Sequence, residues 1–405
     1  MKPIVRAGRM KPVHSDIRGP LFVEAMKRQK QGIDILKLNT GNPATFGFGL
    51  PDSIKNALME HMQDGVGYCD FKGMPQARQA ICDYETSKGI KGITSDDVFI
   101  GNGVSEVVSF ALTPLLNDGD EVLVPSPSYS LWGNSIYLEG GKPVFYTCDE
   151  QANWYPDIQD IRSKITDKTK AIVIINPNNP TGVLYPKELL LEIIQIARES
   201  GLLIFADEIY DRLVMDGKQH ISLASLTEDV PVITLNGLSK SHCLCGYRCG
   251  WMVISGPREL TEDYRQGIIQ LTSLRLCANT MAQIVIPAAL DDMETPASMV
   301  RPGGRIYEQR EATVRELEKI DGLSFVKNDA AFYVFPKLDV KKFNITNDKQ
   351  FAHDLLDATN ILLVPGSGFD WKDPDHFRIV MLPQADILSD AIRRMGTFLD
   401  GYKQK

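Results

Sequence analysis

The sequence has no long hydrophobic run. No stretch of it approaches the roughly 20 consecutive apolar residues that a membrane-spanning helix needs. The first residues, MKPIVRAGRMKPVHSDIRG, lack the apolar core of a secretion signal. We therefore expect a protein with no membrane role.

Cysteine is scarce, and its spacing excludes a disulfide framework. The seven cysteines are odd in number and follow no regular pattern. We expect reduced thiols in a cytoplasmic protein. His242, Cys243, Cys245 and Cys249 lie close in sequence, but their H-C-x-C-x3-C spacing is not that of a structural zinc site. We therefore predict no metal site.

Neither sign of charge is in large excess. The chain has 44 basic and 52 acidic residues, a net charge of −8, and the two signs are interspersed. This distribution argues against partners that are held by global charge, such as nucleic acid or a membrane surface. Repeats and low-complexity linkers are also missing from the sequence.

The 405 residues do contain short apolar strands that alternate with amphipathic helices from about residue 50 to 290. Strands that are apolar throughout predict an α/β fold with a mostly parallel sheet that helices cover on both faces. In such sheets ligands bind beyond the carboxyl ends of the strands. The predicted strands are Val98–Ile100, Glu121–Val124, Ala171–Ile175, Leu202–Ala206, Val232–Leu235 and Trp251–Ile254. Helices are predicted at Pro20–Gln31, Val107–Leu116, Pro186–Ser200, Gly304–Lys319 and Lys349–Thr359.

The C-terminal part mixes strands and helices after its long charged helix. Its predicted strands are Leu323–Val326, Ala331–Pro336, Ile361–Val364 and Phe377–Leu382. This pattern is typical of a smaller α+β domain, onto which we expect the N-terminal segment to pack. We place the large domain at residues 45–295 and build the small domain from residues 1–44 and 296–405.

One lysine, Lys240, lies in the stretch NGLSKSHCLCGYRCGW between two apolar runs. An ammonium group is costly to bury, and proteins place lysine in such a position where its amine must be a nucleophile. Burial lowers the pKa of the amine, and the neutral amine can form a Schiff base. The alternative is an ordinary lysine on a surface loop.

Two motifs after predicted strands suit a flat, phosphorylated ligand. In GNGVSE, the glycines permit a tight turn, and Val104 and Ser105 at the start of a helix offer N–H groups and a hydroxyl to a phosphate. In PSPSYSLW, Tyr129 is able to stack on a heterocycle. Each has a plain alternative, a strand–helix turn with a serine cap and an aromatic ring that fills a gap.

Three further motifs place polar side chains after strands. The turn NPNNPTG is rigid, and Asn179 in it can donate its amide to a phenolic oxygen. Asp207 follows a buried strand and needs a cation, for which a protonated pyridine nitrogen would serve, with Tyr210 in reach of the same ring. Arg378 presents a fork that matches a carboxylate. The alternatives are structural asparagines, a helix cap and an exposed edge-strand arginine.

Together, and in this order, the motifs resemble the pyridoxal-phosphate enzymes of fold type I, specifically the class I/II aminotransferases. The resemblance covers essentially the whole chain and is greatest to the bacterial glutamate–pyruvate (alanine) aminotransferase group. The segments that carry it are DIRGP, LNTGNPATFGF, GYCDFKG, IGNGVSE, VIINPNNPTG, IFADEIYD, NGLSK, RLCAN, PGGRIYEQR and PDHFRIV.

The resemblance implies a role for each motif. Lys240 would carry pyridoxal phosphate covalently and later move the proton, and Asp207 would pair with the ring nitrogen. Tyr210 and Asn179 would bond the phenolic oxygen, and Tyr129 would stack on the ring. The phosphate would be held by Val104, Ser105, Ser239 and Arg248, together with Tyr68 of a neighbouring subunit, so that the working unit is a homodimer. The substrate carboxylate would be bound by Arg378, Gly41 and Asn179.

The implied reaction moves an amino group between L-alanine/pyruvate and glutamate/2-oxoglutarate by ping-pong kinetics. Three departures from the alanine aminotransferase pattern concern the substrate. Ser15 stands in place of an aromatic residue, Cys243 with His242 before it in place of an arginine, and serines flank Tyr129 in place of Asp and Pro. Arg18 and Arg275 are candidates for binding the side-chain carboxylate of glutamate, with ordinary surface or interface arginines as the alternative.

Other functions stay open. The first is a pyridoxal-phosphate β-lyase that acts on a substrate such as cystathionine, because the same cofactor-binding residues serve both reactions. A second is an aminotransferase of other neutral or aromatic amino acids. A third is a non-catalytic regulator with an aminotransferase-like module, but the enzyme-like pattern starts by residue 16, and we expect no preceding DNA-binding domain.

Overall fold

The computed structural model describes residues 2–405 and is built on one large sheet. In the described chain this sheet has eight strands in the order β2-β9-β8-β7-β6-β3-β4-β5. Five of them, β8, β7, β6, β3 and β4, run parallel, whereas β9 is antiparallel to both of its neighbours. The strands are β2 (Val98–Asn102), β3 (Glu121–Ser126), β4 (Lys142–Asp149), β5 (Tyr155–Pro156), β6 (Thr169–Ile175), β7 (Leu203–Asp207), β8 (Val232–Gly237) and β9 (Cys249–Ser255).

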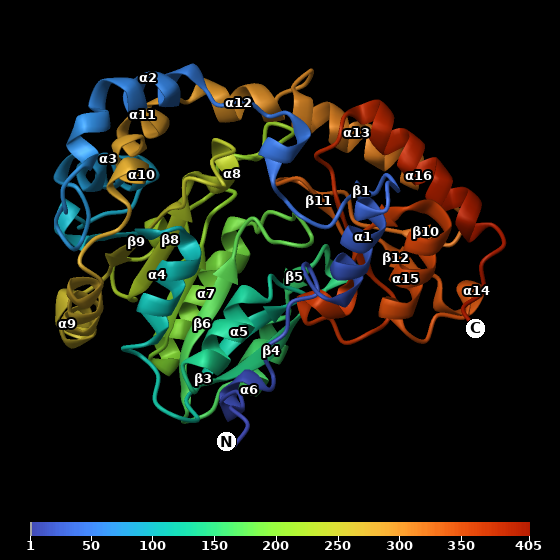
Figure 1. Ribbon diagram of the computed structural model, residues 1–405. Coiled ribbons are helices and arrows are strands. Elements are labelled where there is room, and N and C mark those ends of the chain that lie inside the picture. Colours follow the sequence, from blue (N-terminus) through green and yellow to red (C-terminus); the bar gives the residue numbers. More distant parts are fainter. Residues whose placement is uncertain (1) are drawn as a thin grey trace.

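Helices cover both faces of this sheet (Figure 1). Alternate residues of β6 enter different hydrophobic cores, Val173 on the side of α4, α5 and α9 and Ile172 on the side of α6 and α7. The helices of this part are α2 (Asp52–His61), α3 (Pro75–Ser87), α4 (Val104–Leu112), α5 (Leu131–Leu138), α6 (Ile158–Lys164), α7 (Lys187–Ser200), α8 (Leu238–Ser241), α9 (Arg258–Arg275), α10 (Thr280–Ile284), α11 (Ile286–Asp291) and α12 (Glu294–Val300). The prediction of a mostly parallel, doubly covered sheet is confirmed.

All six strands predicted in this region are present, and β4 and β5 were not predicted. Strand β4 begins with the exposed Lys142 and mixes buried with half-buried residues along its length. It therefore lacks the continuous apolar run that marks the inner strands. Its neighbour β5 has only two residues and pairs antiparallel with it.

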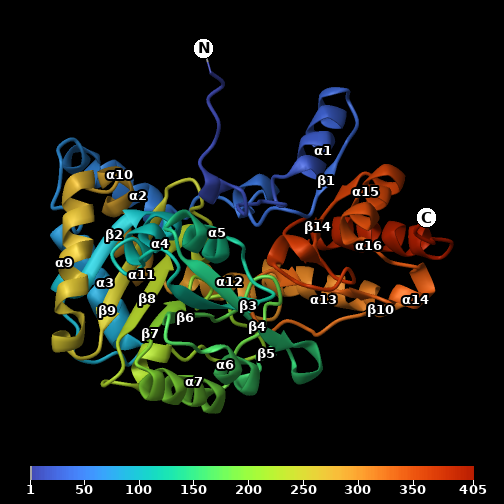
Figure 2. The ribbon, with the colours of Figure 1, turned by 90° about the horizontal axis from the view of Figure 1, so that it is seen from below.

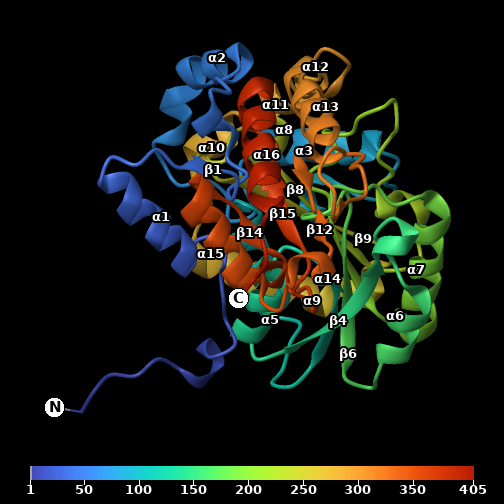
Figure 3. The same cartoon turned by 90° about the vertical axis from the view of Figure 1, so that its right-hand side faces the viewer.

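The C-terminal part lies beside the large sheet and contains short strands and helices (Figure 1). Strand β1 pairs in parallel with β13, so the N-terminal segment is hydrogen-bonded to this part. In Figure 3, α13 and α16 lie side by side next to β14 and β15. The elements are α1 (Pro20–Lys30), α13 (Arg305–Leu317), α14 (Val340–Phe343), α15 (Asp348–Thr359), α16 (Ala385–Leu399), β1 (Leu36–Lys37), β10 (Leu323–Ser324), β11 (Tyr333–Val334), β12 (Lys337–Leu338), β13 (Ile361–Leu362), β14 (Val364–Pro365) and β15 (Phe377–Val380).

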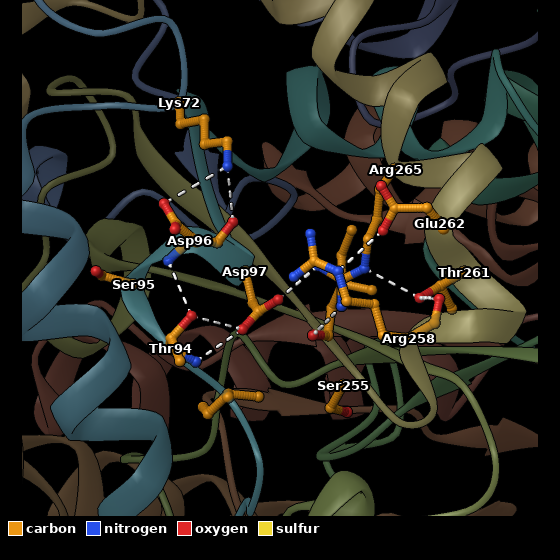
Figure 4. Close-up of polar contacts among 12 residues, drawn as sticks. Lys72, Thr94, Ser95, Asp96, Asp97, Ser255, Arg258, Thr261, Glu262 and Arg265 are labelled. Carbon is orange, nitrogen blue, oxygen red and sulfur yellow. Dashed lines mark hydrogen bonds and ion pairs between the residues drawn. The ribbon is translucent and has the colours of Figure 1, made fainter.

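A buried ion pair fixes α9 against the edge of the sheet (Figure 4). The Arg265 guanidinium on α9 donates to the Asp97 carboxylate at 2.6 Å and to the backbone carbonyl of Ile254 in β9 at 3.0 Å. The other Asp97 oxygen accepts from the N–H and hydroxyl of Thr94. Because Asp97 directly precedes β2, this pair sets the position of the strand that leads into the GNGVSE motif.

No single helix in residues 2–405 has the length and apolarity to cross a membrane. The helices α9 and Thr280–Asp291 reach that length and apolarity only when they are taken together, and a bend of 119° separates them. The N-terminal residues extend away from the body (Figure 2), and the side chains of Ile4 and Val5 there are exposed.

Candidate active site

The candidate site lies at the carboxyl ends of three neighbouring parallel strands. Asp207 is the last residue of β7 and pairs with Ile175 at the end of β6 and Leu235 in β8. Strand β6 leads into the NPNNPTG turn, and β8 leads directly into α8, which carries Lys240. The parallel order of these strands therefore brings the motifs to one edge of the sheet, as predicted.

Lys240 lies in the four-residue helix α8, between the buried Ser239 and Ser241. Its Nζ donates to the carbonyl of Gly41 at 2.8 Å and lies 3.9 Å from Sγ of Cys245. Burial lowers the pKa of this amine, but the negative charges that Tyr333, Cys245 and Tyr129 would carry outweigh it, and the pKa is raised. The lowering by burial is as expected, and these neighbouring side chains oppose it in the protein without ligand.

Asp207 is 5% exposed and has no cationic partner among residues 2–405. One oxygen accepts from the indole N–H of Trp132 at 3.1 Å, and the other accepts a long bond of 3.4 Å from the backbone of Ile209. Burial raises the pKa of the carboxyl to about 6, although the Trp132 bond lowers it. No helix follows Asp207 directly, which removes the helix-cap alternative. A buried carboxyl without a cation suits a positively charged ligand atom.

Arg378, on β15, is fully buried and is also without an acidic partner in the described chain. One of its terminal nitrogens donates to Oδ1 of Asn179 at 2.9 Å, and the other donates to the carbonyl of Asn39. The guanidinium carbon lies 4.6 Å from the ring centres of both Tyr333 and Phe369. Its Nε is buried without a hydrogen-bond partner. The edge-strand alternative is wrong, and an anion would compensate this charge.

The loop between β2 and α4 forms a cradle at a helix start. Helix α4 begins at Val104, three residues before the predicted start, so Val104 and Ser105 lie in its first turn. A Cβ on Gly103 would lie 2.3 Å from a nitrogen of Arg248, and one on Gly250 would lie 2.3 Å from the backbone nitrogen of Val104. Glycine is favoured at position 103 by its φ of +85° and at position 250 by the close backbone, and the exposed Arg248 guanidinium lies at the helix N-terminus.

Tyr210 and Tyr129 belong to the same region. The hydroxyl of the buried Tyr210 lies 2.9 Å from the hydroxyl of Tyr333, and a Cβ on Gly41 would lie 2.2 Å from that same Tyr333 oxygen. Tyr129 is half-buried in the turn before α5, one residue after Ser128, whose N–H donates to the carbonyl of Phe369. These contacts connect the lysine, the two tyrosines and the arginine.

Three predicted residues do not join this group. Tyr68 is 84% exposed on the surface of the chain, and Arg18 is exposed as well. Arg275 donates to the Glu106 carboxylate at 2.6 Å and to the carbonyls of Phe71 and Ile100. Its guanidinium is therefore committed to the first turn of α4, to β2 and to the segment before α3.

The departures at positions 242 and 243 line a cavity of about 330 Å³ that also includes Phe48 and Met299. His242 is fully buried, contacts the carbonyl of Asp292 at 3.2 Å, and burial lowers its pKa to about 4. Cys243 contacts the sulfur of Met299 at 3.8 Å. A neutral imidazole and a thiol therefore stand where the alanine group is expected to carry an arginine.

Two residues of the site, Trp132 and Tyr333, were not predicted. Trp132 ends the motif PSPSYSLW, and Tyr333 lies inside the strand predicted at Ala331–Pro336. Each is nearly fully buried and carries one polar atom that must find a partner. That partner is Asp207 for Trp132 and Tyr210 for Tyr333.

Comparison with known proteins agrees with this geometry. The family model of the class I and II aminotransferases matches residues 33–392. Two curated relatives are the glutamate-pyruvate aminotransferases AlaA of Haemophilus influenzae, 50% identical over 404 residues, and of Escherichia coli, 47% identical, each with 100% of both chains covered. A crystal structure of an aminotransferase from Escherichia coli has a TM-score of 0.98 at 47% identity and covers 100% of both chains. The chain therefore belongs to the class I and II aminotransferases.

Proposed function

We propose that the enzyme transfers an amino group between L-alanine/pyruvate and glutamate/2-oxoglutarate, with pyridoxal phosphate as cofactor. The observation that carries the proposal is the pair of buried ionisable groups without a counter-charge, Asp207 and Arg378. A carboxyl without a cation suits a ring nitrogen, and a guanidinium without an anion suits an amino acid carboxylate. The similarity to glutamate-pyruvate aminotransferases supports the choice of substrates.

The chemistry of the side chains present suits the cofactor. Asp207 would hold the protonated ring nitrogen, Tyr210 and Asn179 the phenolic oxygen, and Tyr129 one face of the ring. The phosphate would lie at the start of α4, where Val104 and Ser105 offer N–H groups beside Arg248 and the buried Ser239. When bound, pyridoxal phosphate supplies an electron sink for the bonds around the substrate's Cα.

The protein's own groups then perform the proton transfer. Arg378 binds the substrate carboxylate, with Asn179 and Gly41 beside it, and so orients the Cα–H bond. The Lys240 amine would take the proton from the substrate's Cα as general base and would later give it back as general acid. The aromatic rings of Tyr333 and Phe369 against Arg378 keep water from its faces, which strengthens carboxylate binding.

We also propose that the working unit is a homodimer and that the chain has two domains, residues 45–295 and residues 1–44 with 296–405. The exposed Tyr68 supports the dimer, since its phenol is free to reach a partner subunit. The pairing of β1 with β13 supports the inclusion of the N-terminal segment in the small domain. Arg18 on that segment would bind the side-chain carboxylate of glutamate.

The proposal is tested by an absorption spectrum of the purified enzyme before and after L-alanine is added without any 2-oxo acid. We expect the visible band of the bound cofactor to disappear with one pyruvate formed per subunit, and 2-oxoglutarate to restore it. Continuous release of pyruvate and ammonia from a β-substituted amino acid, with no response to alanine, would instead identify a lyase.

A further inference from the structure

Tyr333 contacts two functional groups of the candidate site at once. It is 2% exposed and lies on β11. Its hydroxyl is 2.9 Å from the Tyr210 hydroxyl, and the two rings meet nearly at right angles, 83°, with centres 5.6 Å apart. Its ring face covers Arg378 at 4.6 Å. The Tyr333 side chain thus contacts both Tyr210, which would bond the phenolic oxygen, and Arg378, which would bind the substrate carboxylate.

The Tyr333 phenol also lies next to Gly41, the residue that Lys240 contacts. The Tyr333 oxygen would lie 2.2 Å from a Cβ on Gly41, so this position accepts only glycine. The carbonyl of Gly41 accepts the hydrogen bond from Nζ of Lys240. Tyr333 therefore contacts Gly41, and Gly41 in turn accepts the hydrogen bond from the Lys240 amine.

The direction of the hydrogen bond between the two tyrosines follows from their proton count. A phenol has one proton to donate. If Tyr210 donates it to the phenolic oxygen of the cofactor, as the proposed function requires, Tyr210 accepts from Tyr333. A hydroxyl that accepts a hydrogen bond is a stronger donor, because consecutive bonds polarise one another.

We propose that Tyr333 is a positioning residue that strengthens hydrogen-bond donation by Tyr210 and holds the Arg378 guanidinium in place relative to Tyr210. This inference rests on the proposed function. Strand β11 pairs with β15 through Tyr333 and Val380, and β15 carries Arg378, whereas Tyr210 follows β7 of the large sheet. Tyr333 therefore also links the substrate-carboxylate residue to the large sheet.

The test is a pH titration of the cofactor's visible absorption in the intact holoenzyme, for wild type and Tyr333→Phe. Without the Tyr333 hydroxyl, Tyr210 donates a weaker hydrogen bond to the phenolic oxygen of the cofactor. More negative charge then stays on that oxygen, and the proton on the cofactor-bound nitrogen next to it is held more tightly. We expect the titration midpoint to rise by roughly half a pH unit. The KM for alanine should change less than twofold, because the ring over Arg378 remains.

Two further variants separate this role from simple structural support. Tyr333→Leu removes the ring as well and should raise the KM for alanine in addition to moving the midpoint. Tyr264→Phe removes a phenol that donates to the carbonyl of Ala111 outside the site, at 2.7 Å, and should leave the midpoint unchanged. In a Tyr210→Phe background, Tyr333→Phe should give no further shift, since the two act through one bond.

An unchanged midpoint in Tyr333→Phe, or an equal shift on the Tyr210→Phe background, would overturn the inference and leave the proposed function intact. A wild-type enzyme that shows no cofactor band even with added pyridoxal phosphate would overturn both. The outcomes are therefore distinguishable in one series of spectra.

Discussion

At the scale of residues, the site is defined by charges that the protein itself leaves uncompensated. Asp207 is buried with an indole as its main partner, and Arg378 is buried between two aromatic rings. Burial raises the pKa of Asp207 and lowers that of Arg378, so both ionised forms are disfavoured without ligand. Each charge becomes favourable when a counter-charge arrives, which links binding to ionisation.

Cofactor affinity should depend on pH through Asp207. The pKa of its carboxyl rises from 3.8 to about 6 on folding, so the cofactor-free fold binds the proton more tightly and loses stability as pH rises from about 4 to about 6. The ionised form, present above about 6, is the one that pairs with a cationic ring nitrogen. Below that pH we expect affinity for pyridoxal phosphate to fall by about tenfold per unit.

Fluorescence titration of the cofactor-free protein measures this profile. Asp207→Asn should flatten it, since no ionisation remains at that position. Trp132→Phe should move it to higher pH, because the indole bond lowers the pKa of Asp207. A wild-type profile that is flat between pH 5 and 7 would contradict the role of Asp207.

Arg18 should affect one substrate and not the other. Arg18→Ala removes a guanidinium from the exposed segment before α1, and we expect kcat/KM for 2-oxoglutarate to drop roughly ten- to a hundredfold. Turnover of alanine in the half-reaction should be unchanged, since alanine has no side-chain carboxylate. Full activity with 2-oxoglutarate would remove Arg18 from the site, and the acceptor's second carboxylate would then need another partner.

At the scale of elements, the ends of the strands determine where the site lies, and the start of α4 contributes to it. The inner strands were predicted because their residues are apolar throughout, and the ends of β6, β7 and β8 carry the predicted motifs. The start of α4 was placed three residues late, because Val104 and Ser105 follow a glycine turn whose geometry depends on Arg248 packed against Gly103. Such a contact between β2 and β9 regions is not visible in local sequence.

The buried pair Asp97–Arg265 should be important for stability. Asp97→Ala leaves the Arg265 guanidinium buried without its carboxylate, which costs about 3–5 kcal/mol. The change is measured as a lower urea midpoint of the holoenzyme. Arg258→Ala on the same helix removes the exposed pair with Glu262 and is the matched control, with an expected unchanged midpoint. Equal effects of the two substitutions would contradict the importance of burial.

At the scale of the whole molecule, order along the chain predicted more than local detail did. The series of motifs predicted the fold type and the family, and the structure and comparisons confirm both. The roles of Trp132 and Tyr333 were not predictable, because their partners Asp207 and Tyr210 are 75 and 123 residues away in sequence. The raised pKa of Lys240 depends in part on Tyr333, which is also distant in sequence and which opposes the lowering by burial.

The proposed homodimer makes a prediction about mixed subunits. Each site would combine Lys240 of one chain with Tyr68 of its partner. Lys240→Ala and Tyr68→Ala would therefore remove residues that different subunits contribute to the same site. Co-expressed with separate tags, the two variants should give hybrid dimers with one intact site, and the mixture should have about a quarter of wild-type activity. Purified hybrids no more active than the mean of the two parents would show that Tyr68 acts within its own chain or not at all.

The most direct test of the account is to find which lysine carries the cofactor. The holoenzyme is reduced with borohydride, digested, and its peptides are analysed by mass spectrometry. We predict that the phosphopyridoxyl group is attached to Lys240 and that Lys240→Ala abolishes the labelled peptide. A label on another lysine, or none after incubation with pyridoxal phosphate, would contradict the assignment on which the proposed function rests.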